Sequence, residues 1–247
     1  MDLNQINFHV IQQVDSTNKY AMEKVSEGLA QHLDAWFAIE QTEGKGQRGK
    51  SWVSNPGENI TFSIVIRPQQ CFQNIPYTFN AFITLVCRDF ISQMLQLDVQ
   101  IKWPNDLFIN DRKSGGILIE NRYAGDKWKW AIVGIGINVN QIDFPENLFA
   151  ATSFKKITNT DFEPIHLAKL LHKDLIEAIE STNQINESFI WERYNQHLFK
   201  KGQQSRFKIS GVEINATVSF VNHQGLMILA QNEKETSYHL GEIEWML

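Results

Sequence analysis

The stretch Gly44-Lys45-Gly46-Gln47-Arg48-Gly49-Lys50-Ser51-Trp52 decides between two fold classes. Its first eight residues match G-x-x-x-x-G-K-S, the phosphate loop of P-loop nucleotidases. Such a loop must continue into a helix, because the helix N-terminus supplies part of the anion site. Here the chain continues as Val53-Ser54-Asn55-Pro56-Gly57, which is a turn sequence. We therefore predict a cationic glycine loop between strands and reject the P-loop.

The segments on both sides of this loop predict strands. Residues 35–41 form an apolar run typical of a buried strand, and residues 60–66 alternate as a half-buried strand. The rest of the first 200 residues mixes both periodicities. Strands are predicted at residues 8–14, 99–103, 107–109, 116–119 and 128–140, and helices at residues 17–28, 76–97, 167–179 and 189–198. The mixture predicts an α+β domain.

The pattern changes after Gly202, where only short strands follow. They are predicted at residues 207–209, 214–220, 226–229, 237–240 and 243–245. Closely spaced strands without helices suggest a small barrel, which would be marginal alone and is expected to pack on the larger domain. We predict a main domain over residues 1–200 and a barrel over residues 201–247.

Composition excludes several classes of protein. With 28 acidic and 23 basic residues among 247, the formal charge of −5 argues against bulk nucleic-acid binding. Cys71 and Cys87 have no disulfide or zinc spacing, which predicts reduced thiols in the cytoplasm. The sequence contains no apolar run long enough to predict export or membrane insertion. The scattered histidines predict no metal site, and no nucleophile signature is visible.

The strand at residues 133–140 places different residues on its two faces. Ile135, Ile137 and Val139 fall on one face, whereas Gly134, Gly136 and Asn138 fall on the other. A bare backbone face lets a flat ligand lie close and be read at its edge by the amide. Glycines that make room for a core helix or aromatic side chain are the alternative. The strand alone favours this packing explanation.

Two further turns carry candidate polar groups. In the first, the segment from Lys102 to Leu107 ends a strand in proline and then presents an amide and a carboxylate on a rigid turn. In the second, Lys113 stands beside Gly115 and Gly116 at the start of a strand. This lysine is a candidate cation for developing phosphate charge, and a solvated hairpin lysine is the alternative.

Five motifs in a fixed order connect these features. They are Asp15-Ser16-Thr17-Asn18, Gln41-Thr42 with the glycine loop to Trp52, Lys102-Trp103-Pro104-Asn105-Asp106, Arg112-Lys113-Ser114-Gly115-Gly116-Ile117-Leu118 and Gly134-Ile135-Gly136-Ile137-Asn138. In these motifs the chain resembles the biotin–protein ligase family over roughly residues 8–140, and in its later layout of helices and strands over the remainder. The resemblance implies an α+β catalytic domain like that of class II aminoacyl-tRNA synthetases, with a mixed sheet flanked by helices, and a C-terminal SH3-like β-barrel.

The resemblance also implies a two-step ligation. Biotin and Mg-ATP give biotinyl-5′-AMP and pyrophosphate, and a lysine of a biotin carboxyl carrier domain then attacks the mixed anhydride. ATP with Mg²⁺ is thus the implied co-substrate, biotin the substrate and the carrier domain the partner. A cytoplasmic enzyme is implied, with no DNA or membrane partner. The oligomeric state stays open, with a homodimer as one option.

Site residues follow from positions in the motifs. The implied catalytic residues are Lys113 and Arg48, whose charges oppose the repulsion between carboxylate and α-phosphate, and Asp106, which positions or deprotonates the incoming lysine. The implied biotin-binding residues are Ser16, Thr17, Asn18, Gln41, Gly44, Lys45, Lys113, Gly115, Gly116, Ile117 and Leu118. The implied ATP-binding residues are Lys45, Gln47, Arg48, Gly49, Lys50, Trp52, Asn105, Lys113 and Asn138. Trp52 would cover the adenine and Asn138 would read its edge, so the bare face gains a function.

The chain departs from the family pattern in two places. The loop usually reads G-R-G-R-x-G-R, and here Lys45, Gln47 and Lys50 stand at arginine positions. Lysine loses the bidentate fork and glutamine loses the charge, so weaker retention of the adenylate is expected. The first motif begins at Asp15, so the N-terminal DNA-binding domain of bifunctional members is not expected.

Two rival functions remain open. A lipoate or octanoate ligase or transferase shares the fold and the use of a carrier lysine, but the glycine loop and Lys102-Trp103-Pro104-Asn105-Asp106 favour biotin. A non-catalytic biotin-binding module would keep the pocket and lose turnover. The presence of Lys113, Asp106 and Arg48 argues against such a module.

Overall fold

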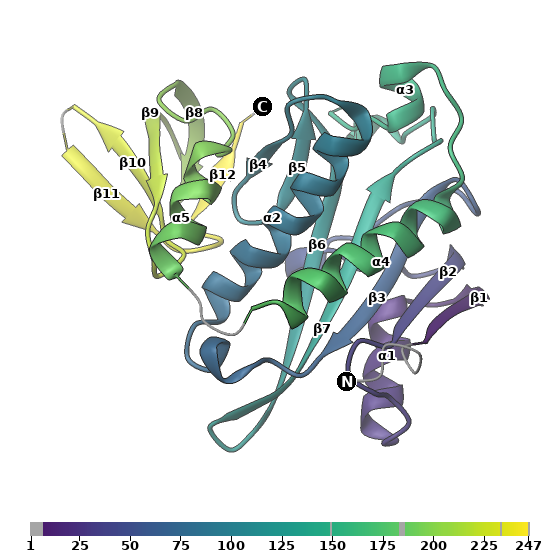
Figure 1. The fold of residues 1–247 in the computed structure, drawn as a ribbon. Helices are drawn as coiled ribbons and strands as arrows, with labels where there is room; N and C mark the ends of the chain where they lie inside the picture. The colour runs from purple at the N-terminus through teal and green to yellow at the C-terminus, as the bar shows by residue number, and fades with distance from the viewer. Residues whose placement is uncertain (1–6, 149, 183–185, 233, 247) are drawn as a thin grey trace.

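The computed structural model describes residues 7–148, 150–182, 186–232 and 234–246. Within them a seven-stranded mixed sheet runs in the order β1-β2-β3-β7-β6-β5-β4, as Figure 1 shows. Only β1 and β2 pair in parallel. The strands are β1 (Phe8–Val14), β2 (Ala35–Gln41), β3 (Asn59–Ile66), β4 (Gln100–Lys102), β5 (Asp106–Ile109), β6 (Arg112–Ala124) and β7 (Lys127–Asn138). The predicted mixed sheet is confirmed.

Helices cover both faces of this sheet. Figure 1 shows α2 (Pro76–Leu95) and α4 (Pro164–Glu180) on one face and α1 (Thr17–Ser26) on the other. Because strand residues alternate, Phe37 packs in the main core, whereas Trp36 packs with Ala21 of α1. The helices are α1 (Thr17–Ser26), α2 (Pro76–Leu95), α3 (Phe154–Thr158), α4 (Pro164–Glu180) and α5 (Glu187–Gln196), with 3₁₀ turns η2 (Gln47–Gly49), η3 (Gln70–Phe72) and η4 (Glu146–Leu148). Among the described residues, no helix is long and apolar enough to cross a membrane.

The C-terminal strands form a separate five-stranded antiparallel sheet in the order β11-β10-β9-β8-β12. They are β8 (Gln204–Ile209), β9 (Val212–Val221), β10 (Met227–Gln231), β11 (Lys234–Tyr238) and β12 (Ile243–Trp245). This sheet is in accord with the predicted SH3-like barrel. The fourth strand lies three residues earlier than predicted, because Lys-Glu-Thr-Ser-Tyr is mostly exposed and shows no apolar alternation.

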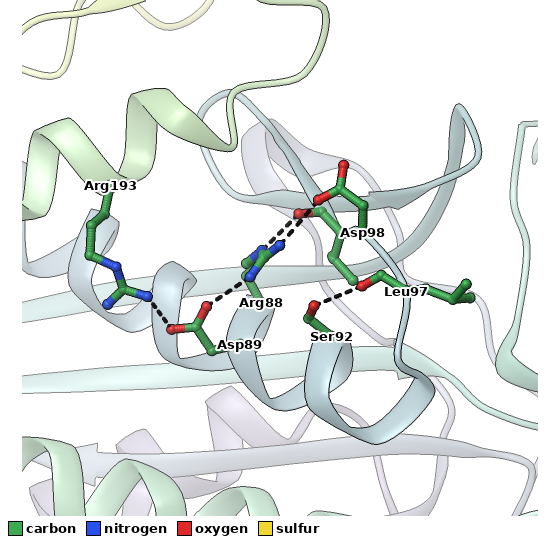
Figure 2. Close-up of polar contacts among 7 residues, drawn as sticks. Arg88, Asp89, Ser92, Leu97, Asp98 and Arg193 are labelled. Atoms are coloured by element: carbon green, nitrogen blue, oxygen red, sulfur yellow. Dashed lines mark hydrogen bonds and ion pairs between the residues drawn. The ribbon is translucent and has the colours of Figure 1, made fainter.

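A polar network fixes the edge of the main sheet next to the barrel. Arg88 of α2 donates from Nε to the Val99 carbonyl at 2.8 Å, and its other nitrogens pair with Asp98 at 3.1 Å and Asp89 at 3.0 Å. Arg193 of α5 pairs with the same Asp89 at 2.6 Å (Figure 2). The network joins α2, α5 and the start of β4, so the strand that carries Lys102 is anchored from two helices.

Strand register aligns residues of four strands into one row across the sheet. Lys102 pairs with Asp106, Asp106 with Gly116, and Gly116 with Gly136. Cross-strand partners share a face, so the row lies on the face that carries α1, beyond the N-terminus of that helix. Ile135 and Ile137 point into the opposite core, which confirms the predicted assignment of faces.

Candidate functional site

A cavity of about 880 Å³ lies over this row. Its walls include the start of α1, the glycine loop, the turn between β4 and β5, the loop after β7 with Phe144 and Leu148, and the edge of the C-terminal sheet. Segments from both sheets therefore meet around one space. Its two ends differ in chemistry, one neutral and one cationic.

The neutral end is built around the N-terminus of α1. The Thr17 amide donates to Gln41 Oε1 at 2.8 Å, and the Thr17 hydroxyl donates to the same oxygen at 3.1 Å. Ser16 and Thr17 are both buried. A helix start leaves backbone N–H groups without partners, and here a side chain from β2 satisfies one of them. Gln41 is thus held with its oxygen on α1.

Asn18 completes this end through a buried network. Its Oδ1 accepts from Ser63 Oγ at 2.6 Å, and its Nδ2 donates to Glu120 at 2.8 Å and to the Leu118 carbonyl at 3.3 Å. A side chain at Gly134 would overlap Asn18 Oδ1, so β7 needs glycine there. All polar atoms of the Asn18 amide are bonded inside the protein. Asn18 therefore positions Leu118 in the cavity wall.

The cationic end is built around Lys113 and Asp106, whose Nζ and Oδ1 atoms lie 2.6 Å apart. A bulge between β5 and β6 pairs Phe108 with Lys113 but Leu107 with Gly115. The extra residue, Ser114, is buried and bonds to the Leu107 carbonyl at 3.1 Å. A bulge shifts the alternation of side chains. As a result Lys113 and Gly116, three residues apart, face the same cavity.

The glycine loop closes on itself and does not lead into a helix. Gly46 N donates to Lys50 O at 2.7 Å, and Trp52 N donates to Gly44 O at 2.8 Å. Arg48 has φ 55°, in the left-handed region that non-glycine residues rarely adopt. A short 3₁₀ turn and then an extended segment take the place of the helix that a P-loop requires. The rejection of the P-loop is confirmed.

The glycine face of β7 is covered by side chains, which corrects the prediction that it is bare. Trp52 lies on Gly136, where an added Cβ would stand 2.5 Å from Trp52 Cε2. Asn138 is buried and donates from Nδ2 to the Thr152 carbonyl at 2.9 Å. The alternative explanation, glycines that make room for an aromatic ring, therefore holds for Gly136. The sequence could not show this because Trp52 reaches β7 from a distant loop.

Most of the predicted site residues line the cavity. They are Ser16, Thr17, Asn18, Gln41, Lys45, Gln47, Arg48, Lys50, Trp52, Asn105, Asp106, Lys113, Gly116, Ile117, Leu118 and Asn138. Gly44, Gly49 and Gly115 lie outside the lining. Gly115 faces the Gly136 carbonyl and Ile137 in the sheet, and Gly44 lies under the Trp52 carbonyl. Asn105 is buried with its amide on the Ile117 carbonyl, so it holds the turn in place.

The C-terminal sheet supplies wall residues that sequence reasoning missed. Gly241, in the turn before β12, lies against Arg48, and an added Cβ would stand 2.7 Å from Arg48 Cζ. Trp245 of β12 has Lys102 Nζ 5.6 Å from its ring centroid. The wall on this side comprises Lys208, Ser210, Gly211, Leu240, Gly241, Glu242, Ile243, Glu244 and Trp245. No local motif marks these residues, because their role arises only from how the two sheets pack.

Residues 10–138 match the model of the biotin/lipoate A/B protein ligase family. A bifunctional ligase/repressor from Escherichia coli is 32% identical over 240 residues, which cover 95% of this chain and 72% of the relative. A ligase/repressor from Bacillus spizizenii is 37% identical over 57% of this chain, and the match spans 44% of that relative. A biotin protein ligase from Aquifex aeolicus, solved with biotin and ATP, has the same fold, with a TM-score of 0.79, 23% identity and coverage of 96% and 97% of the two chains. The chain belongs to the biotin/lipoate A/B protein ligase family.

Proposed function

We propose that this chain is an ATP-dependent biotin–protein ligase that forms biotinyl-5′-AMP and transfers biotin to a lysine of a carrier domain. One observation carries the proposal: a neutral, hydrogen-bonding end at Thr17 and Gln41 and a cationic end at Lys113 and Arg48 share one cavity. Biotin has a neutral ureido ring at one end and a carboxylate at the other. The molecule fits a cavity with this polarity.

In the first step a biotin carboxylate oxygen attacks the α-phosphorus of ATP. An O–P bond forms, the bond to the bridging oxygen breaks, and pyrophosphate leaves with the electron pair. Two anions must approach each other, so preorganised cations lower the barrier by offsetting their repulsion. Lys113 is proposed to bridge carboxylate and phosphate, and Arg48 to approach from the glycine loop. Mg²⁺ is proposed to arrive with the ATP phosphates as part of the co-substrate.

In the second step the carrier lysine attacks the carbonyl carbon of the mixed anhydride. A C–N bond forms, AMP leaves, and the amine loses a proton. Asp106 is the proposed group that positions the amine and accepts this proton. The 2.6 Å contact between Asp106 Oδ1 and Lys113 Nζ supports this role, because it places the carboxylate beside the lysine proposed to hold the reacting groups.

Adenine is proposed to lie against Trp52, which already has Lys113 Nζ 5.8 Å from its ring centroid. Asn138 uses Nδ2 to bond Thr152, which leaves Oδ1 as the acceptor for the exocyclic amine of adenine. We also keep residues 1–200 and 201–247 as the proposed catalytic and barrel domains. A cytoplasmic location is proposed, in accord with the free thiols Cys71 and Cys87.

Lipoate or octanoate ligation is the competing proposal within the same family. Ser16 and Thr17, which are buried, and Gln41, which is half-buried, present polar groups that an apolar chain or a dithiolane could not bond. These groups favour the ureido ring. A binding module without turnover is the other competitor, and the paired Lys113 and Asp106 argue against it.

Isotope exchange between ATP and pyrophosphate tests the proposal. The purified chain should catalyse exchange that depends on biotin, and should then label a carrier domain at its acceptor lysine. Exchange with lipoate or octanoate alone would support the competing ligase. Biotin binding without exchange would reduce the chain to a binding module and contradict the proposal.

A further inference from the structure

Lys102 is a charged residue of the cavity that the proposed chemistry leaves unused. It is the last residue of β4, it lines the cavity, and it is half-buried. Among the described residues, its ammonium has neither a hydrogen bond nor an ion pair, and it lies over two aromatic rings. Nζ lies 5.5 Å from the ring centroid of Phe108 and 5.6 Å from that of Trp245.

This position is costly for a lysine. Burial lowers the pKa of Lys102, since removal of water disfavours the charged form. Contacts with two aromatic rings return only part of the lost hydration. The backbone nevertheless holds the residue in place: Ile101 N donates to His197 O at 2.7 Å, and Phe199 N donates to Ile101 O at 2.9 Å. The chain thus fixes an ammonium at a place where no acceptor from the described part of the chain bonds it.

The charges around Lys102 do not balance. Its field includes Asp106, Lys113 and Lys50, and Asp106 is already paired with Lys113. On the barrel side, Lys208, Glu242 and Glu244 also line the cavity. On the sheet side, Lys102, Lys113 and Lys50 outnumber Asp106 by two charges, and on the barrel side Glu242 and Glu244 outnumber Lys208 by one. One net positive charge remains at this point of the cavity, and it lies on the sheet side, where an anion would fit next to Lys102.

One hydrogen-bond donor of the barrel wall also lacks an acceptor in the described structure. Trp245 lines the cavity and packs on Phe207 and Phe199, with ring centroids 4.7 and 5.6 Å away. Its Nε1 is buried and has no hydrogen-bond partner among the described residues. The indole N–H of Trp245 and the ammonium of Lys102 therefore lie close together, and neither has a hydrogen-bond acceptor among the described residues. The ammonium of Lys102, which lines the cavity without an acceptor in that part of the chain, points to a ligand that carries anionic oxygen atoms.

We propose that Lys102 binds the β- and γ-phosphates of ATP against the Trp245 wall and stabilises pyrophosphate as it leaves. The inference rests on the proposed ligase function and adds a residue to it. Along the row from Gly136 through Gly116 and Asp106, Lys102 is the last position at the sheet edge. Lys102 therefore lies at the end of the row that is farthest from the neutral end, where biotin is proposed to bind. When the bond between the α-phosphorus and the bridging oxygen breaks, the electron pair stays on pyrophosphate, and the ammonium meets that growing charge.

The test uses Lys102→Met in the full chain, because methionine keeps most of the side-chain length and removes the charge. Biotin-dependent exchange should lose about ten- to a hundredfold in kcat/KM for ATP, with a higher KM for pyrophosphate. Transfer from synthetic biotinyl-5′-AMP to the carrier domain should keep its rate, and biotin affinity should not change. Lys102→Arg should recover part of the exchange. The thermal midpoint of Lys102→Met should equal or exceed that of the wild type, since a poorly solvated charge is removed.

Lys200→Met is the matched control. Lys200 also lies over an aromatic ring, 5.3 Å from the Phe199 centroid, but does not line the cavity. This variant should leave exchange and transfer unchanged. Equal losses of exchange and transfer in Lys102→Met, or an unchanged KM for pyrophosphate, would overturn the inference. Absence of exchange in the wild type would instead overturn the proposed function, so the two failures are distinct.

Discussion

The two ends of the cavity are built on opposite principles. At the neutral end, Thr17, Asn18 and Gln41 bond to one another or to the sheet, so each side chain has a partner in the protein. At the cationic end, Lys102 has no acceptor among the described residues, and Trp52 Nε1 is likewise a buried donor without a partner there. One end is complete before a ligand arrives, whereas the other lacks the anions that would complete it.

This difference indicates how one cavity can serve two substrates in sequence. A prebuilt, uncharged surface costs little to reorganise and can select a ring by shape and hydrogen bonds. A surplus of cations instead attracts phosphate and gains most as negative charge develops. Substitutions at the neutral end should therefore change biotin affinity, and substitutions at the cationic end should change the rate of adenylation.

The largest effect is expected from Lys113→Met. Removal of the cation proposed to bridge carboxylate and phosphate should lower kcat for biotin-dependent exchange by about 10²- to 10³-fold. Biotin affinity should fall far less. Exchange kinetics and calorimetry with biotin measure the two quantities. A variant that loses biotin binding in proportion to exchange would erase the distinction between the two ends.

A smaller effect is expected from Thr17→Val at the neutral end. The hydroxyl of Thr17 donates to Gln41 and accepts from Ser63 at 2.8 Å, so valine removes two hydrogen bonds from the buried network and a polar group from the neutral end. Biotin affinity should drop by about ten- to a hundredfold, while kcat at saturating biotin changes little. Thr158→Val removes a hydroxyl that bonds only to the Phe154 carbonyl and backbone near it, outside the cavity, and should leave both unchanged. Lower kcat with unchanged affinity in Thr17→Val would contradict the assignment.

A several-fold effect is expected from Gln47→Arg in the glycine loop. This change restores a guanidinium that can bind phosphate through two hydrogen bonds. Leakage of biotinyl-5′-AMP from the enzyme, followed after rapid dilution, should slow by about three- to tenfold. A leak rate that is unchanged at low salt would show that position 47 does not contact the adenylate.

The smallest effect is expected on the pH dependence of stability, and it comes from His172, which lies outside both ends of the cavity. His172 of α4 is buried with Nε2 2.8 Å from the Leu33 carbonyl, and burial lowers its pKa. The unfolded chain binds the proton more readily, so the stability that depends on neutral His172 is full above the unfolded-state pKa of about 6.5 and is lost as pH falls through the lower folded-state value.

The thermal midpoint should accordingly fall by roughly 2–4 °C on acidification over this range, and His172→Gln should flatten that dependence. Differential scanning calorimetry at several pH values measures it. His32 and His197 also have pKa values lowered by burial, so some slope should remain in the variant. The same dependence of the thermal midpoint on pH in the wild type and in His172→Gln would show that His172 does not contribute to it.

Periodicity and motifs were enough to predict the mixed sheet, its flanking helices and the faces of β7. They failed where tertiary packing alone sets the outcome. Trp52 covers Gly136 from a loop more than eighty residues earlier in the sequence. Arg48 packs against Gly241, which belongs to the C-terminal barrel. The bulge at Ser114, which turns Lys113 toward the cavity, also depends on pairing with a neighbouring strand. Such contacts join segments that carry no shared local pattern.

The contrast between the two ends is tested most directly by the salt dependence of binding. Calorimetry would compare ATP with biotinol, the neutral alcohol analogue of biotin, between about 50 and about 300 mM salt. The Kd for biotinol should stay nearly constant, because its ring meets only uncharged partners. The Kd for ATP should rise about tenfold or more, because its phosphates meet a surplus of cations. Equal salt dependence for the two ligands, or no binding of biotinol, would contradict the account.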